Sequence, residues 1–321
     1  INPISVNSGT SALHLGLAVA NIKPGDEVIL PAQTFVATGM AVLMQGAVPV
    51  FADIQYDTGN IDPVSIRNKI TERTKLIIAV HWGGYPCDMD EINNIANEFN
   101  LIVMEDAAHA LGAKYKDKPI GSISNLTAFS FQAIKHLTTG DGGALCCMDN
   151  IDCFEAKKKR WFGIDRENSK PSELGERVFD IDKVGYKYHM NDVSAAMGLG
   201  NLQNFSSQLF RIQQIANIYR TELENVDGLQ LLDYREDRKS SYWLFTVLVE
   251  NRVDFVRKLK EYNVPSSVVS QRIDRFSVFK QNNENLTSQE RFDKKQISIP
   301  IHPALTDEDI SIVLSSIMNG W

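Results

Sequence analysis

The sequence predicts an α/β fold in which helices cover both faces of a mostly parallel β-sheet. From residue 10 to about residue 150, short apolar segments alternate with segments of helical spacing, which is the order typical of this fold class. The segments 76–80 and 101–105 are strongly apolar, as expected of strands buried on both faces. After residue 150 the pattern changes, which indicates a second, smaller domain.

The individual elements follow from helical spacing of apolar residues and from short apolar runs. Helices are expected at 10–21, 34–45, 88–100, 151–162, 191–225, 253–262 and 307–318. Strands are expected at 27–30, 48–52, 76–80, 101–105, 127–131, 143–148 and 247–250. Residues 164–182 are polar and mixed in charge, and we expect them to form a mobile surface loop. A chain of 321 residues is long enough for two domains, which we place at 1–205 and 206–321.

Composition and charge exclude several classes of protein. Apolar residues are 43% of the chain and charged residues 23%, which argues against disorder. The 33 basic and 40 acidic residues leave a formal net charge of −7, so neither nucleic acid nor a membrane surface is an expected partner. No apolar run approaches the roughly 18 residues that span a bilayer. We therefore expect a cytoplasmic protein.

The four cysteines show no paired C-x-x-C spacing; they are Cys87, Cys146, Cys147 and Cys153. We expect reduced thiols, as in cytosolic proteins. Cys146 and Cys147 lie in an apolar run and are expected in the core. Without paired ligand spacing, no metal site is expected.

A first candidate site is the segment NSGTSAL at residues 7–13. Gly9 permits a tight turn, and Thr10 and Ser11 open a helix. Free backbone N–H groups at a helix start bind phosphate, assisted by hydroxyls and the helix dipole. A plain helix cap explains the same residues, because Ser and Thr commonly fill that role.

A second candidate is VMEDAAHALGA at residues 103–113. It begins at the C-terminal end of an apolar strand, where α/β folds bind ligands. Asp106 can pair there with a cationic nitrogen, and His109 follows three residues later. The alternatives are a capping carboxylate and a buried histidine with satisfied hydrogen bonds.

A third candidate is FSFQAIKHLTTGDGG at residues 129–143, where Ser130 ends a strand. Lys135 lies between Ile134 and His136, with apolar strands on either side. Partial burial lowers the pKa of an amine and makes it nucleophilic toward a carbonyl. The alternative is a lysine that extends from a loop into solvent.

Together these three segments meet the requirements of pyridoxal 5′-phosphate chemistry. The lysine forms a Schiff base with the cofactor, the strand-end carboxylate keeps the pyridine nitrogen protonated, and the helix start holds the phosphate. Pyridoxal 5′-phosphate is therefore the expected cofactor.

These motifs, in this order and spacing, resemble those of the DegT/DnrJ/EryC1/StrS sugar aminotransferases. The resemblance covers nearly the whole chain; the matching segments are NSGTSALHLGL, GDEVILPAQTFVAT, EDAAHALGA, FSFQAIKHLTTGDGG, WFGIDRE, GYKYHMNDVSAAMGL and ISIPIHPALTDEDI. It implies fold type I of the pyridoxal phosphate enzymes. In that fold a large domain with a mixed, mostly parallel sheet between helices precedes a smaller C-terminal α+β domain.

The resemblance also implies roles for single residues. Lys135 binds the cofactor covalently and moves a proton between the substrate Cα and the cofactor C4′. Asp106 pairs with the pyridine nitrogen, and His109 lies near the ring oxygen. Phe35 stacks on the ring, although a core position is the alternative for this residue. The residues assigned to the phosphate are Thr10, Ser11 and Ser130.

Two further segments carry roles that the resemblance implies, each with an alternative. Lys187 in GYKYHMND stands where the family commonly has an Asn that reaches the phosphate of the neighbouring subunit; it acts there as a point charge or is a surface lysine. Arg272 and Arg275 lie in a variable region near the sugar nucleotide, where they meet a diphosphate or extend into solvent. Family members also have a few dozen residues before the position of Ile1, so we expect an N-terminal segment to be missing.

The expected function is that of an aminotransferase. By resemblance it moves an amino group from glutamate to a nucleotide-linked keto-deoxy sugar, for surface polysaccharides or secondary-metabolite sugars, in a homodimer with a shared active site. A dehydratase of the same family is one alternative, although those relatives carry His in place of the lysine. A non-catalytic regulatory relic of the fold is the other.

Overall fold

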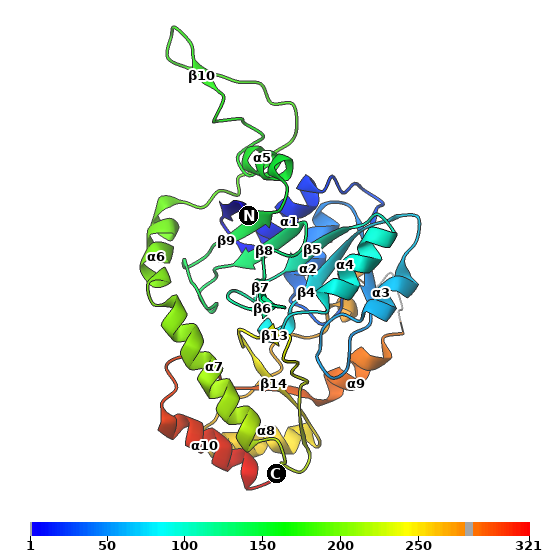
Figure 1. Ribbon diagram of the computed structural model, residues 1–321, viewed down its shortest axis with the longest axis vertical. Helices are drawn as coiled ribbons and strands as arrows, with labels where there is room; N and C mark the ends of the chain where they lie inside the picture. Colours follow the sequence, from blue (N-terminus) through cyan, green and yellow to red (C-terminus); the bar gives the residue numbers. More distant parts are fainter. Residues whose placement is uncertain (1, 280–284) are drawn as a thin grey trace.

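The computed structural model, which describes residues 2–279 and 285–321, is organised around a seven-stranded mixed sheet (Figure 1). The strands lie in the order β1-β9-β8-β5-β4-β2-β3. Neighbours from β8 to β3 are parallel, whereas β9 runs antiparallel to both β8 and β1. The predicted α/β class with a mostly parallel sheet is therefore confirmed. In chain order the strands are Asn2–Val6 (β1), Glu27–Pro31 (β2), Val48–Ala52 (β3), Thr74–Val80 (β4), Ile102–Asp106 (β5), Leu126–Ser130 (β8) and Gly143–Cys147 (β9).

Helices cover both faces of the sheet because its strands send alternate side chains into two separate cores. In β4, Leu76 and Ile78 belong to one core, whereas Ile77 and Ala79 belong to the other. The helices on the first face are α1 (Gly9–Val19), α2 (Val36–Met44) and α5 (Asn150–Lys159). Those on the second face are α3 (Pro63–Lys69) and α4 (Met89–Glu98). This double cover explains why the inner strands read as continuous apolar runs.

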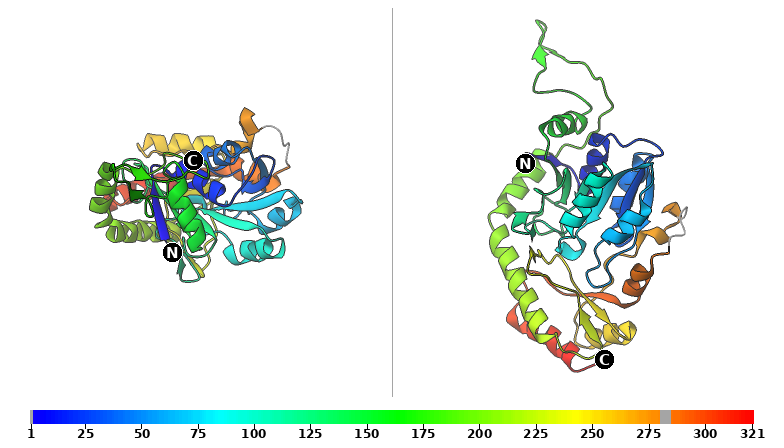
Figure 2. Two further views of the ribbon diagram at one scale, coloured as in Figure 1. Left: turned by 90° about the horizontal axis from the view of Figure 1, so that it is seen from above. Right: turned by 45° about the vertical axis from the view of Figure 1, so that its right-hand side comes forward.

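A third core lies at the end of the molecule that holds the C-terminus (Figure 2). It is built from Ile212 and later residues, with helices packed on a small antiparallel sheet. Its elements are α7 (Phe205–Glu222), β12 (Leu229–Leu231), β14 (Phe245–Val249), α8 (Arg252–Glu261), β15 (Gln296–Ile299) and α10 (Asp307–Met318). Ile273 and Phe279 return to the first core, so the chain crosses between the two parts more than once. The domain boundary at residues 205 and 206 stays a prediction.

The predicted elements occur close to their expected positions, with two differences that matter for the site. The helix predicted at 34–45 starts at Val36, and Phe35 precedes it in an extended conformation with ψ 148°. The region predicted as one helix, 191–225, forms two, α6 (Asp192–Leu202) and α7. They separate at Asn204, a residue type that favours helix caps over helix interiors.

Several short elements were not predicted. They are β1, α3, β12, α9 (Thr287–Lys295), β15 and a small sheet of β6 (Lys114–Tyr115), β7 (Lys118–Pro119) and β13 (Arg238–Lys239). Most of them are shorter than the windows over which periodicity is informative.

Residues 164–182 lie on the surface, as predicted, and project beyond α5 (Figure 1). They carry a two-stranded hairpin, β10 (Lys170–Pro171) and β11 (Arg177–Val178). The four cysteines are buried free thiols, and Cys146 and Cys147 lie in strand β9 as core residues. Over residues 2–279 and 285–321, no helix has both the length and the apolar character of a bilayer crossing. The same ranges contain no cluster of potential metal ligands.

Because α1 packs on the sheet, we expect substitutions of two leucines to differ greatly in their effect on the stability of the protein. Leu15 of α1 is fully buried in the first core, whereas Leu174 in the projecting loop is 89% exposed. We expect Leu15→Ala to lower the free energy of unfolding by about 2–5 kcal/mol, because it leaves a cavity. Leu174→Ala should change it by less than about 0.5 kcal/mol. Equal effects of the two substitutions in urea unfolding would contradict this packing.

Candidate active site

A cavity of about 440 Å³ opens at the C-terminal ends of three parallel strands. Val80, Asp106 and Ser130 are the last residues of β4, β5 and β8, and all three line it. The N-terminal ends of α1 and α2 close one side. The lining residues are Ser8, Gly9, Thr10, Leu13, Thr34, Phe35, Ala37, Thr38, Val80, Asp106, Ala108, His109, Ser130, Gln132, Ile134, Lys135, Asp141, Trp243, Val269 and Ser270. The structure therefore brings the three candidate segments together at the edge where α/β folds bind ligands.

The start of α1 offers backbone donors to this cavity. Ser8 is the N-cap, and its Oγ accepts a hydrogen bond of 3.0 Å from the Ser11 N–H. No hydrogen bond from the N–H of Gly9 or Thr10 occurs among the described residues. These two groups lie at a positive helix end beside Ser130, because a Cβ built on Gly9 would come within 2.8 Å of the Ser130 Cβ. The arrangement suits a phosphate.

Asp106 is held rigidly at the cavity wall. Its Oδ2 accepts a hydrogen bond of 2.7 Å from Thr38 Oγ1, and its Oδ1 accepts one of 3.1 Å from the Ala108 N–H. Burial raises the pKa of this carboxyl, whereas the two donors and the Lys135 charge oppose the rise. A cationic nitrogen in the cavity would further favour the carboxylate.

Lys135 lies in the irregular loop between β8 and β9. Burial lowers the pKa of its amine to about 8, and attraction to Asp106 opposes the change. Its Nζ lies 3.6 Å from the centre of the Trp243 ring. The amine is therefore partly neutral near pH 8 and able to attack a carbonyl.

His109 and Phe35 differ in their exposure: the histidine is buried in the cavity wall, and the phenylalanine is exposed at the cavity rim. His109 is buried and stacks on Trp243 at 3.8 Å with an angle of 15° between the rings. Burial, followed by the nearby Lys135 charge, lowers the pKa of its imidazole, and its Nδ1 has no hydrogen-bond partner in the described part of the chain. Phe35 is 61% exposed at the cavity rim, so it is not the core residue that its apolar character allowed.

Four predicted residues do not line the cavity. The Ser11 hydroxyl donates to Asn7 Oδ1 at 2.6 Å inside the helix cap. Lys187 is exposed. The other two are Arg272 and Arg275, each of which lies in an ion pair.

The two arginines are already paired. Arg272 is only 4% exposed, and its guanidinium binds Asp274 through hydrogen bonds of 2.8 and 2.6 Å. Arg275 pairs with Asp293 at 2.8 Å and remains largely exposed. The diphosphate role expected for Arg272 therefore finds no free guanidinium in this arrangement.

Among the lining residues that had no role assigned from the sequence, three make contacts that shape the site. Ser8 caps α1, and its place before Gly9 is a recognisable cap signal. Thr38, one turn into the expected helix, supports Asp106. Trp243 belongs to the segment before β14, and nothing in its local sequence indicates that it reaches a cavity more than 100 residues away in the chain.

Comparison with known proteins identifies the family. Residues 2–318 match the sequence model of the DegT/DnrJ/EryC1/StrS aminotransferase family. The chain belongs to this family.

Curated relatives of the DegT/DnrJ/EryC1/StrS family are similar over almost the whole chain. An uncharacterized protein of Methanocaldococcus jannaschii is 41% identical, covering 98% of this chain and 84% of its own length. A UDP-4-amino-4-deoxy-L-arabinose–oxoglutarate aminotransferase of Shewanella sediminis is 32% identical, with coverage of 98% and 85%. A GDP-perosamine synthase of Escherichia coli O157:H7 is 31% identical, with coverage of 98% and 84%.

Solved structures of the family confirm fold type I. Sugar aminotransferase CalS13 from Micromonospora echinospora superposes with a TM-score of 0.95 at 32% identity, covering 99% of this chain and 87% of the other. The pyridoxal phosphate form of a putative sugar aminotransferase from Streptococcus pneumoniae gives a TM-score of 0.89 at 29% identity, with coverage of 99% and 86%. Pyridoxal 5′-phosphate is the cofactor of this aminotransferase family.

The residues in the cavity fit this cofactor. The free N–H groups of Gly9 and Thr10 suit its phosphate, and the buried Asp106 suits its ring nitrogen. The unpartnered Nδ1 of buried His109 marks a place for a polar atom, and the amine of Lys135 suits its aldehyde. One cavity therefore holds a partner for each functional group of the cofactor.

The close approach of Gly9 to Ser130 predicts that Gly9→Ala weakens cofactor binding. The added methyl would push Ser130 away from the helix start, and we expect at least a tenfold loss in affinity for pyridoxal 5′-phosphate, or about 1.4 kcal/mol. Absorbance titration measures it. Gly200→Ala is the control, because a Cβ at this position of α6 has no atom within 4 Å. An unchanged affinity of Gly9→Ala would remove the α1 start from the phosphate site.

Proposed function

We propose that this protein transfers an amino group from glutamate to a nucleotide-linked keto-deoxy sugar. Membership in a sugar aminotransferase family supplies the reaction class. The single observation that carries the proposal is the shared cavity of Lys135, Asp106 and the α1 start. These groups meet the three requirements of amino transfer with pyridoxal phosphate.

Each residue has a task that follows from its surroundings. When bound, the cofactor supplies an electron sink for the electrons that remain at Cα after a proton leaves. Asp106 stays charged beside the ring nitrogen, held by Thr38 and Ala108. Thr10 and Ser130 hold the phosphate at the α1 start, and Phe35 limits tilting of the ring from the cavity rim.

Lys135 performs the proton transfers in this proposal. Its neutral amine takes the proton from Cα of the amino donor and then donates it to the cofactor C4′. An amine whose pKa lies at about 8 changes protonation state at small cost near neutral pH, so it serves as base and then as acid. In the second half of the reaction the same lysine makes these two proton transfers in the reverse direction.

The substrate classes come from the relatives. One relative is named for UDP-4-amino-4-deoxy-L-arabinose and oxoglutarate, and another for GDP-perosamine. Both names contain a nucleotide-linked amino sugar, and oxoglutarate is the keto acid that glutamate leaves after giving up its amine. A role in surface polysaccharide or secondary-metabolite sugar synthesis follows from this substrate class.

A homodimer with a shared site completes the proposal. Phe35 and Ile134 at the cavity rim are 61% and 68% exposed, which suits cover by a second copy. Exposed Lys187 would then reach the phosphate of the partner's cofactor as a point charge, and Arg275 is the arginine left with exposed surface for a diphosphate. Buried reduced thiols suit a cytoplasmic location.

Lys135→Ala should abolish both the covalent adduct and the transfer. With the wild-type protein, borohydride reduction should fix pyridoxal phosphate on the peptide that contains Lys135, as read by mass spectrometry. Lys135→Ala should lose this adduct and at least 10³-fold in the rate of the half-reaction with glutamate, because no group of suitable pKa replaces it. Lys260→Ala, an exposed position on α8, is the control.

The same assay separates the alternatives. Formation of deoxy-sugar product without consumption of glutamate would indicate a dehydratase. Persistence of the full adduct in Lys135→Ala would show that another lysine carries the cofactor.

A further inference from the structure

Two hydrogen bonds join the segment 240–244 to the loop that carries Lys135. One lies on each side of the lysine. The indole Nε1–H of Trp243 donates a hydrogen bond of 3.0 Å to the carbonyl oxygen of Ile134. On the other side, His136 Nε2 donates to the Ser241 carbonyl oxygen at 2.9 Å. The two residues next to Lys135 are therefore tied to one short segment. Since the Lys135 loop has no regular structure, these bonds limit where its side chain can start.

Tyr242 gives this segment an unusual backbone turn. Its φ is +50°, a value rarely adopted by a bulky residue without support from its surroundings. The turn is held by a bond of 3.0 Å from the Tyr242 N–H to Ser240 Oγ and by stacking of Tyr242 on Tyr234.

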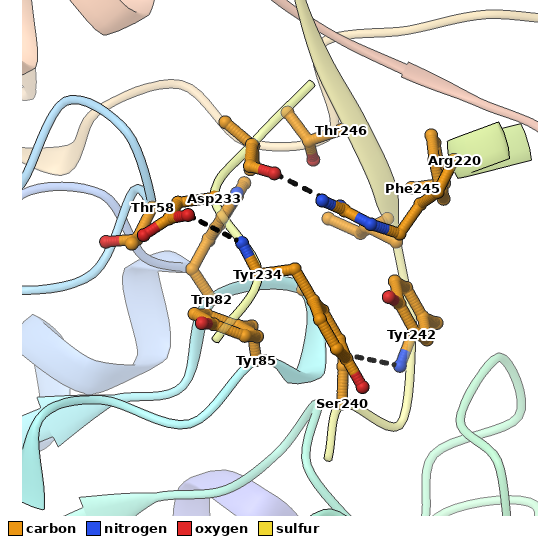
Figure 3. A pocket seen from close by; sticks show the side chains of 13 residues that line it. Thr58, Trp82, Tyr85, Arg220, Asp233, Tyr234, Ser240, Tyr242, Phe245 and Thr246 are labelled. Carbon is orange, nitrogen blue, oxygen red and sulfur yellow. Dashed lines mark hydrogen bonds between the residues drawn. The ribbon is translucent and has the colours of Figure 1, made fainter. Parts of the chain in front are cut away.

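Figure 3 shows Tyr242, Tyr234 and Ser240 lining a small separate pocket beside Trp82 and Arg220. Trp243, the next residue, instead lines the cavity that contains Lys135. Tyr242 and Trp243 both border a further pocket beside Lys135, but only Trp243 lines the active-site cavity, where its ring lies against the lysine amine.

Trp243 contacts two nitrogen-bearing side chains of the cavity, those of Lys135 and His109. Lys135 Nζ lies 3.6 Å from the ring centre, a distance at which the ring face attracts an ammonium. His109 stacks on the same indole at 3.8 Å. A ring held between them fixes the distance from the amine to the imidazole.

We propose that Trp243 is a positioning residue for Lys135, with its indole face holding the lysine amine in the cavity whenever the amine is not bonded to the cofactor. This inference rests on the proposed function of Lys135. In that function the amine is released when the amino donor binds, takes the Cα proton, and passes it to the cofactor C4′. A flexible chain of four methylenes would otherwise sample many positions during this interval. The ring also favours the amine most after it has gained the proton, because the attraction is to the ammonium.

The test measures the protonation of Lys135 in cofactor-free protein. Reductive methylation with formaldehyde and a borohydride reagent, read by mass spectrometry over a pH series, reports the fraction of neutral amine. Trp243→Leu keeps apolar bulk and removes the ring attraction, so it should lower the pH midpoint by about one unit. Trp243→Phe should give a smaller decrease. The groups around the amine are unchanged in both variants: Asp106, His109, His136 and Asp141.

A second readout follows the reaction itself. In single turnovers of pyridoxal phosphate-loaded protein with glutamate, Trp243→Leu should lower the maximal rate about tenfold and leave the half-saturating glutamate concentration within twofold. A matched control is Trp321→Leu, because Trp321 also donates its indole N–H to a carbonyl, that of Glu250 at 2.8 Å, but lies in the third core. This variant should leave the midpoint and the rate unchanged.

The outcomes separate the inference from the function on which it rests. A pH midpoint and single-turnover rate of Trp243→Leu equal to wild type, with the adduct on Lys135 intact, would overturn the positioning role and leave the proposed function standing. Absence of the adduct from the wild-type Lys135 peptide would overturn both. A lower midpoint and a slower turnover in Trp243→Leu with normal thermal unfolding would support the inference.

Discussion

The site depends on one carboxylate and one amine that face the same shielded cavity. Burial acts on both groups in the direction of neutrality, since it raises the pKa of Asp106 and lowers that of Lys135. Their mutual attraction opposes both shifts. The bonds from Thr38 and Ala108 further favour the charged form of Asp106, whereas the Lys135 amine lies against the face of Trp243. The balance leaves a carboxylate suited to a cationic ring nitrogen and an amine suited to nucleophilic attack.

The sheet fixes where this pair can meet. Asp106 ends β5 and directs its side chain into the cavity, whereas Glu105 is fully buried in the sheet. Glu105 accepts a hydrogen bond of 2.9 Å from His81 Nε2, and the Cys87 N–H donates to His81 Nδ1 at 3.1 Å. This assignment follows because Nδ1 must accept, which leaves the proton on Nε2. These hydrogen bonds fix the end of the strand directly beside Asp106. A site that must hold a ring in one orientation requires rigid support of this kind.

The sequence predicted much of this arrangement, because its signals are local. The apolar runs of β4 and β5 and the hydroxyl cluster at residues 8–11 are each readable in a few residues, and strand ends in a parallel sheet meet at one edge. The start of α2 at Val36 could not be read as closely, so the predicted helix began two residues too early, at residue 34. The pairing of Arg272 with Asp274 and the reach of Trp243 depend on how the C-terminal elements pack against the sheet. No periodicity in the chain encodes those contacts between distant segments.

A high-resolution crystal structure of the protein with pyridoxal 5′-phosphate bound would decide whether Lys135, Asp106 and the α1 start hold the cofactor together. We expect continuous electron density from Lys135 Nζ to the cofactor, with the pyridine nitrogen within hydrogen-bond distance of an Asp106 oxygen and the phosphate at the N–H groups of Gly9 and Thr10. Density that placed the cofactor on another lysine, or its ring nitrogen away from Asp106, would contradict it.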